Sequence, residues 1–228
     1  MPDDIDGFVH HVVLTSIVAD GRAPSPARLA AAIGASEPEA VAAMRRLHDG
    51  HGLVLHPGST DVWAAHPFSL VPTHHWVETE RRGWWAPCVW CALGVVALVG
   101  EPACIYTRLG GESEPVVLEC AGGRVTPARL VAHFPVPVAR AWDNVHRFCG
   151  SALVFGDEAA VVGWCSRHGV GRGDVLPLDT VAALARLWYG GHLARDWKKW
   201  TVAEARAIFR EVGLDGPTWD LPEASGRF

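Results

Sequence analysis

Two cysteines three positions apart, Cys88 and Cys91, stand in the stretch GWWAPCVWCALGVVALVG, residues 83–100. A proline precedes the first cysteine and an apolar run follows the second. At helical spacing, Cys88 falls on the first turn of a helix beginning at Pro87, where unpaired backbone N–H groups and the helix dipole stabilise a thiolate. Cys91 lies one turn later on the same face. Both sulfur atoms are therefore expected to reach one soft cation.

A third thiol, Cys149, lies in NVHRFCG, with His146 three residues before it. The pattern C-x-x-C followed by H-x-x-C fits a Cys₃His zinc site, although its two halves are far apart for a common zinc module. Other interpretations are a disulfide, a thioredoxin-like redox pair and small core residues. The redox pair needs a preceding strand in a βαβ unit, and ETERRGWWAP, residues 78–87, is a poor strand.

The composition limits the class of protein. The chain has 228 residues, is 49% hydrophobic and 20% charged, and carries a net charge of -5, which excludes wholesale disorder. The acidic balance disfavours nucleic acid as a partner. The longest apolar run, residues 92–100, is too short for a membrane helix, and the acidic N-terminus lacks signal-peptide features. We therefore expect a cytoplasmic protein, where cysteines are mostly reduced.

Hydrophobic periodicity and turn residues predict the elements that position these thiols. Strands are predicted over 53–56, 62–66, 103–109, 115–120, 131–138 and 151–156, and helices over 5–19, 26–33, 37–49, 87–99, 157–169, 178–194 and 201–213. Short strands mixed with helices indicate an α+β fold, with mostly antiparallel strands and flanking helices.

The pattern of the first 70 residues predicts three helices followed by a strand pair, which is the order found in a winged helix-turn-helix. We therefore expect a winged-helix-like N-terminal domain over 1–70 and a main domain over 71–228 that ends in a helical extension. The third predicted helix offers Arg45 and Arg46 against three acidic residues, which is weak support for DNA binding. A structural or substrate-capping role is favoured.

The cysteine segment resembles the alkylmercury lyase (organomercurial lyase) family. WAPCVWCALGVVALVG matches the family's aromatic-x-Cys-Ala-x-Asp segment, which runs into an apolar helix ending Ala-Leu-hydrophobic-Gly, when Cys88 takes the first catalytic cysteine. RFCG resembles the segment around the second catalytic cysteine and assigns Cys149 that role. VVGWCSRHG matches the family's Trp-x-x-x-His stretch with Trp164 and His168 in register.

The resemblance implies an enzyme that cleaves a carbon–mercury bond. Two thiolates capture the mercury of R–Hg⁺, an acid protonates the leaving carbon, and Hg²⁺ stays on sulfur. No cofactor is implied, and the partner is a small organometal or organic molecule. The family's catalytic aspartate is Cys91 here, so Cys88, Cys91 and Cys149 are the candidate catalytic and metal-binding residues. A third thiol would hold a soft cation longer, with Cu and Zn as further candidates beside Hg.

Four aromatic or histidine residues are candidates for the pocket wall. His146 is the best candidate for a thiol-activating base, and His75 for a proton shuttle near neutral pH. Trp85 and Trp90 flank the thiols and are expected to form pocket wall or core. Two further functions stay open: a soft-metal binding or sensing protein, and a thiol-dependent enzyme acting on an organic substrate without mercury. The sequence leaves the oligomeric state open.

Overall fold

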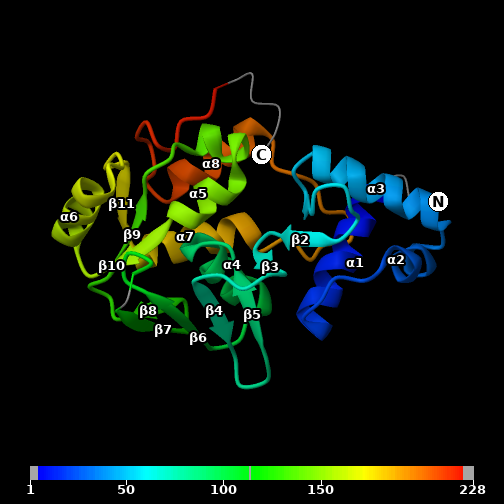
Figure 1. Ribbon diagram of the computed structural model, residues 1–228, viewed down its shortest axis with the longest axis horizontal. Coiled ribbons are helices and arrows are strands. Elements are labelled where there is room, and N and C mark those ends of the chain that lie inside the picture. Colours follow the sequence, from blue (N-terminus) through cyan, green and yellow to red (C-terminus); the bar gives the residue numbers. More distant parts are fainter. Residues whose placement is uncertain (1–4, 113, 223–228) are drawn as a thin grey trace.

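The computed structural model describes residues 5–112 and 114–222 of the chain. Helices α1–α3 lie at one end of the elongated molecule, and α6 lies with a small sheet at the other (Figure 1). Helix α4, Val89–Val99, and helix α7, Leu178–Tyr189, lie between these ends. Helices and antiparallel sheets occur in one chain, which confirms the predicted α+β class.

The N-terminal helices form where capping residues predict them. Helix α1 spans Ile5–Asp20, α2 spans Pro26–Ile33 and α3 spans Glu37–Asp49. Ser25 accepts the N–H of Arg28 at the start of α2, and Ser36 and Glu39 form a capping box at α3. Apolar faces of the three helices meet in one core that continues into the rest of the chain.

The larger sheet crosses the whole middle of the molecule in the order β1-β2-β3-β5-β4-β6-β7-β8, with antiparallel neighbours. Its strands are β1 Val54–Leu55, β2 Val62–Ala65, β3 Phe68–Ser69, β4 His75–Glu78, β5 Gly83–Ala86, β6 Ala103–Arg108, β7 Pro115–Ala121 and β8 Arg124–Thr126. The strand pair expected as a wing, β1 and β2, is thus joined through β3 to the main sheet. The predicted boundary at residue 70 falls inside that sheet, and the division into two domains stays a prediction.

A smaller sheet has the order β10-β9-β11, in which β9 and β10, the strands predicted near residues 131 and 153, pair with each other. The remaining elements are β9 Val131–Phe134, the 3₁₀ helix η1 Val138–Asp143, α5 Val145–Ser151, β10 Leu153–Phe155, α6 Glu158–His168, β11 Asp174–Pro177 and α8 Val202–Glu211. Figure 1 places α5 and α8 on the same side of the molecule, above α4 and α7.

The segment before the cysteine pair differs from the sequence prediction in two ways. Residues 83–86, expected to be a poor strand, form β5, which pairs with β4 through register contacts such as Trp76 with Trp85. Helix α4 begins at Val89 rather than Pro87, because the strand continues to Ala86 and the chain needs two residues to turn. Strand β5 is antiparallel to both neighbours, so the βαβ unit of a thioredoxin-like pair is absent from the described residues.

Helices α4 and α7 pack at very close range because of one glycine. A Cβ atom on Gly94 would lie 2.3 Å from Cδ2 of Tyr189 and 3.0 Å from Cβ of Pro67. Any side chain at Gly94 would therefore displace the Tyr189 ring. Helix α4 is apolar over its whole length and its first two turns are buried, as expected for a helix enclosed on all sides.

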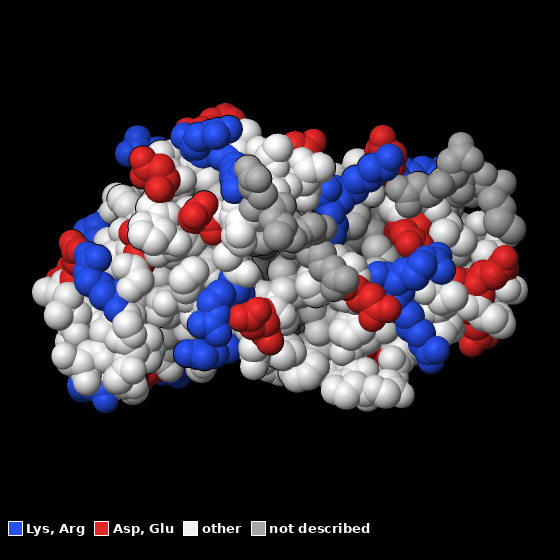
Figure 2. All heavy atoms as spheres, turned by 90° about the horizontal axis from the view of Figure 1, so that it is seen from above, with Lys and Arg blue, Asp and Glu red and all other residues white. Residues whose placement is uncertain are grey.

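Charged side chains of both signs are interspersed over the face seen in Figure 2, and no continuous basic stripe crosses it. None of the helices in the described parts of the chain has the length and apolar character that crossing a membrane requires.

Replacing Gly94 with Ala tests the close packing of α4 on α7. We expect Gly94→Ala to lower the free energy of unfolding by about 1–3 kcal/mol, because the new methyl group overlaps the Tyr189 ring. Gly163→Ala in α6 is the matched control, since a Cβ there meets only the Arg167 side chain at 3.7 Å. Urea unfolding of both variants checks this, and equal stability of the two would contradict it.

Candidate functional site

The sulfur of Cys88 caps the N-terminus of α4. Cys88 has an extended backbone, with φ -154° and ψ 174°, and its Sγ accepts the backbone N–H of Cys91 at 3.3 Å. A side chain at the N-cap faces the unpaired N–H groups and the positive end of the helix dipole, both of which favour an anion. The chain thus places this sulfur where a thiolate is best stabilised.

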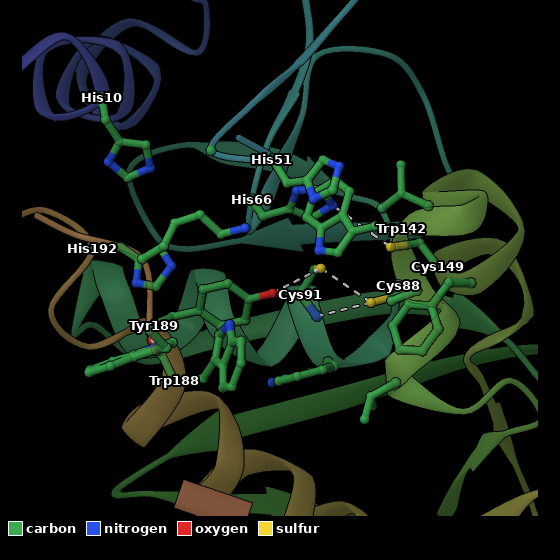
Figure 3. Close-up of a pocket in the computed structure, with 18 of the residues that line it drawn as sticks. His10, His51, His66, Cys88, Cys91, Trp142, Cys149, Trp188, Tyr189 and His192 are labelled. Atoms are coloured by element: carbon green, nitrogen blue, oxygen red, sulfur yellow. Dashed lines mark hydrogen bonds between the residues drawn. The ribbon is translucent and has the colours of Figure 1, made fainter. Parts of the chain in front are cut away.

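Three sulfur atoms meet in one place although they come from two helices (Figure 3). The Sγ atoms of Cys88 and Cys91 lie 3.2 Å apart, which is contact between reduced thiols and far longer than a disulfide bond. Cys149 of α5 lies beside them (Figure 3). Its Sγ lies 3.8 Å from Nε2 of His66, and ligand atoms of His66, Cys91 and Cys149 lie within 4.8 Å of one another.

The end of α5 is tied to the start of α4, which fixes Cys149 against the other thiols. The Asn144 side chain caps α5 by accepting the N–H of Arg147 at 3.0 Å. After the last turn of α5, the carbonyl of Ala152 accepts the N–H of Val89 at 3.4 Å. This bond joins two segments far apart in sequence, so the pairing of Cys149 with Cys88 depends on tertiary structure alone.

The cluster divides into one acidic thiol and two weakly acidic ones. Burial raises the pKa of Cys88, but hydrogen bonds from Cys149 and Cys91 and the nearby His75 outweigh it and leave the pKa well below its ordinary value. Burial and the charge of Cys88 raise the pKa of Cys91. The pKa of Cys149 is also raised, first by its hydrogen bond to Cys88. The resting site therefore holds one thiolate and two thiols.

Tyr189 of α7 completes the contacts of Cys91. Its hydroxyl oxygen lies 3.4 Å from Cys91 Sγ and points toward the cluster in Figure 3. Burial and the charge of the cysteine cluster raise the pKa of Tyr189 well above its ordinary value, so the phenol keeps its proton. Burial lowers the pKa of His66 to about 4, so this imidazole is neutral near pH 7.

The thiols open into a cavity of about 80 Å³ with a mainly aromatic and apolar wall. Its lining residues are His10, His51, Gly52, His66, Cys88, Trp90, Cys91, Val138, Ala141, Trp142, Val145, Phe148, Cys149, Trp188, Tyr189, His192, Trp197, Lys199 and Trp200. None of these described residues is Asp or Glu. Among the described lining residues, the groups that can supply a proton are thiols, a phenol, imidazoles and an ammonium group.

The four residues expected beside the thiols take different places. Trp90 lines the cavity, whereas Trp85 is half-buried and packs on Trp76 outside it. His75 is buried on β4, where burial lowers its pKa to about 4 although the neighbouring Cys88 raises it. His146 is exposed and lies against Trp63, because α5 turns it onto the surface.

The structure adds three residues that the sequence did not single out: His66, Tyr189 and Lys199. His66, rather than His146, supplies the imidazole next to Cys149. His66 is 83 positions from Cys149 in the chain, and Tyr189 is 98 positions from Cys91. No local motif relates positions so distant, and only the packing of β2, α5 and α7 on α4 brings them together.

Comparisons with known proteins identify the family of the chain and a structure with a similar fold. The family model for MerB, alkylmercury lyase, matches residues 68–190, which is more than half of the chain. The chain belongs to the alkylmercury lyase family. A solved structure described as the mercury-bound form of MerB2 superimposes with a TM-score of 0.65 at 16% identity, covering 86% of this chain and 92% of that chain. A comparison with curated protein sequences gives no match.

The chain has a cysteine, Cys91, at the position where the family resemblance predicts the catalytic aspartate. Cys91 is 2% exposed, contacts both Cys88 and Tyr189, and has no carboxylate neighbour in the described cavity wall. Its raised pKa keeps the proton on sulfur near neutral pH.

The pKa of Cys88 can be measured from the pH dependence of its alkylation rate. Because its pKa is lowered, we expect iodoacetamide to modify Cys88 with a rate that is half-maximal well below pH 8.5, where an ordinary thiol titrates. Cys120, whose pKa burial raises to about 12, serves as the internal control and should stay unmodified near neutral pH. Peptide mass spectrometry over pH 5–9 measures both. Modification of Cys149 before Cys88, or a Cys88 midpoint above 8.5, would contradict the assignment.

Proposed function

We propose that this chain cleaves the carbon–mercury bond of a small organomercurial, releasing a hydrocarbon and retaining Hg²⁺ on sulfur. Membership of the alkylmercury lyase family supports the reaction class. The observation that carries the proposal is that the buried Cys91 Sγ lies 3.2 Å from Cys88 Sγ and within 4.8 Å of Cys149 Sγ. Polarizable thiolates bind soft cations better than oxygen or nitrogen ligands do.

The first step is capture of mercury by the Cys88 thiolate. The sulfur displaces the exchangeable ligand of R–Hg–X and forms R–Hg–S, and X leaves as an anion. The cavity volume of about 80 Å³ favours a short alkyl group as R, since a dry cavity that binds benzene is larger, at roughly 150 Å³. The tryptophan-rich wall excludes water and suits an apolar R.

Cys149 then coordinates the same mercury and loses its proton, because a thiol bound to a metal cation is deprotonated. Nε2 of the neutral His66, 3.8 Å from Cys149 Sγ, can accept this proton. Two sulfur donors now place electron density on mercury and weaken its bond to carbon. Asn144 and Ala152 hold Cys149 in reach by fixing both ends of α5.

Cys91 delivers the proton that releases the product. The electron pair of the carbon–mercury bond takes the Cys91 proton to form R–H, and the resulting thiolate binds mercury as its third sulfur ligand. Tyr189, 3.4 Å from Cys91 Sγ, holds the Cys91 side chain in position through its hydroxyl group. With three sulfur ligands, the Hg²⁺ product is held tightly, so product release limits turnover.

A second candidate function is binding of a soft cation without catalysis. The absence of carboxylates from the described cavity wall favours it, because the aspartate expected from the family resemblance is missing. A sensing protein of this kind would bind Hg²⁺ or Cu⁺ on the same three sulfurs and would release no hydrocarbon.

Single-turnover release of ethane from ethylmercury separates these functions. We expect the wild-type protein to release one equivalent of ethane, and Cys91→Ser to slow release by about 100-fold or more, because a serine hydroxyl is a far weaker acid. Cys91→Asp should release ethane, since it restores a carboxylic acid at this position. Cys120→Ser is the control, because Cys120 is buried away from the cavity on β7.

Gas chromatography measures the ethane, and metal analysis of the desalted protein measures bound mercury. Equal release from the wild type and Cys91→Ser would refute Cys91 as the proton donor. Retention of mercury with no ethane from the wild-type protein would refute the lyase and favour the binding function.

A further inference from the structure

The end of the cavity away from the thiols is lined by two imidazoles, His10 of α1 and His192, which follows α7 (Figure 3). Both are buried, with exposed fractions of 0% and 6%. Their ring centres lie 5.9 Å apart, and the His10 ring stacks on Trp197 with the ring centres 3.6 Å apart. We call His10 and His192 the imidazole pair. Polar ring atoms are thus enclosed at one end of a mainly apolar cavity.

Ring nitrogen atoms of the imidazole pair have no hydrogen-bond partner in the described parts of the chain. Nδ1 of His192 is one of them, and His10 is the one described histidine in which both buried ring nitrogens lack a partner. Most buried polar atoms in folded proteins have a partner, and leaving one unpaired costs about 1–3 kcal/mol. A phenylalanine would stack on Trp197 without this cost. The two polar rings therefore point to a ligand that enters the cavity.

The charge of the two rings limits the chemistry of that ligand. Burial lowers the pKa of His192 to about 3 and the pKa of His10 well below its ordinary value, so both rings are neutral near pH 7. A neutral imidazole has one N–H donor and one acceptor nitrogen. A hydroxyl group both donates and accepts, so one hydroxyl can bond to both kinds of nitrogen. An alkyl group of the same size would leave them unpaired.

Tyr189 separates the imidazole pair from the thiols. Its hydroxyl oxygen lies 3.4 Å from Cys91 Sγ, and its ring packs edge-on against His192 with the ring centres 5.0 Å apart. An organic group whose mercury is bound by the thiols reaches the imidazole pair only as an extended chain that lies along this ring. The hydroxyl group must therefore stand at the end of the chain that is remote from mercury.

We propose that the imidazole pair binds the terminal hydroxyl group of a short hydroxyalkyl chain, which makes hydroxyalkylmercury compounds the preferred substrates, a substrate class that rests on the proposed lyase function. The thiols bind mercury, Trp90 of the cavity wall packs on the methylene groups, and His10 and His192 exchange hydrogen bonds with the hydroxyl. The substrate is then held at both ends, which positions its carbon–mercury bond beside Cys91.

Alkylation of Cys88 tests the recognition of a hydroxyl group without any mercury chemistry. Terminal iodoalkanols of two to five carbon atoms are each compared with the iodoalkane that has a methyl group in place of the hydroxyl. The Cys88 thiolate displaces iodide and forms a thioether with either reagent, and each rate constant is divided by that of glutathione. We expect a preference for the alkanol in at least one pair. His10→Phe or His192→Phe should lower this preference by about tenfold, because the hydroxyl loses a buried partner.

Two further variants and a stability measurement separate binding from structure. His74→Phe is the matched control, since His74 is exposed and lies outside the cavity. His192→Gln, which keeps a donor and an acceptor, should retain part of the preference. His10→Phe should unfold at the wild-type temperature or above it, because it removes unpaired buried nitrogens. No preference in the wild-type protein, or a preference that both Phe variants leave unchanged, would overturn the proposal.

A substrate pair extends the test to the proposed reaction. 3-Hydroxypropylmercury and butylmercury differ by a hydroxyl in place of a methyl group and release 1-propanol and butane. The ratio of their kcat/KM values should fall by about tenfold in His192→Phe and stay at the wild-type value in His74→Phe. An equal loss on both substrates would overturn the hydroxyl recognition. If the wild-type protein releases neither product, the lyase proposal fails, and the alkylation preference still decides whether the imidazole pair binds a hydroxyl group.

Discussion

The N-terminus of α4 is the constraint on which the site depends. Cys88 stands at the point where an antiparallel sheet ends and an enclosed apolar helix begins, and its sulfur takes the place of the usual capping oxygen. A buried anion is unfavourable in most of a protein interior. Here the N–H of Cys91, the helix dipole and two thiol donors compensate for burial, so the cluster carries its charge on Cys88.

This arrangement sorts identical side chains into different roles. Only one of the three thiols can be ionised easily, because each charge raises the pKa of its neighbours across short distances. In the proposed reaction the sulfur at the helix N-terminus is the nucleophile, and the sulfur one turn later keeps its proton. Gly94 permits the close approach of α7 that brings Tyr189 to Cys91. Cys91, which stands where the resemblance expects the aspartate, thus keeps a proton beside the Cys88 thiolate.

Much of this could be predicted from the sequence, because the strongest signals are local. Ser25, Ser36 and Glu39 mark helix starts through capping, and the pair Cys88 and Cys91 identifies a family motif. The start of α4 was misplaced by two residues because Pro87 is a common first residue of helices, whereas here it follows a strand. His66, Tyr189 and Lys199 were missed because their roles come from packing between distant segments. His146 had the right spacing to Cys149, but a short helix turns it to the surface.

The central claim is that the sulfurs of Cys88, Cys91 and Cys149 bind one soft cation together. X-ray absorption spectroscopy of the reduced protein with one equivalent of Hg²⁺ tests it most directly, because it counts the sulfur atoms bound to mercury. We expect three sulfur ligands in the wild-type protein and two in Cys91→Ser. Two sulfur ligands in both proteins would show that Cys91 lies outside the metal site, and the account of a three-thiol centre would be wrong.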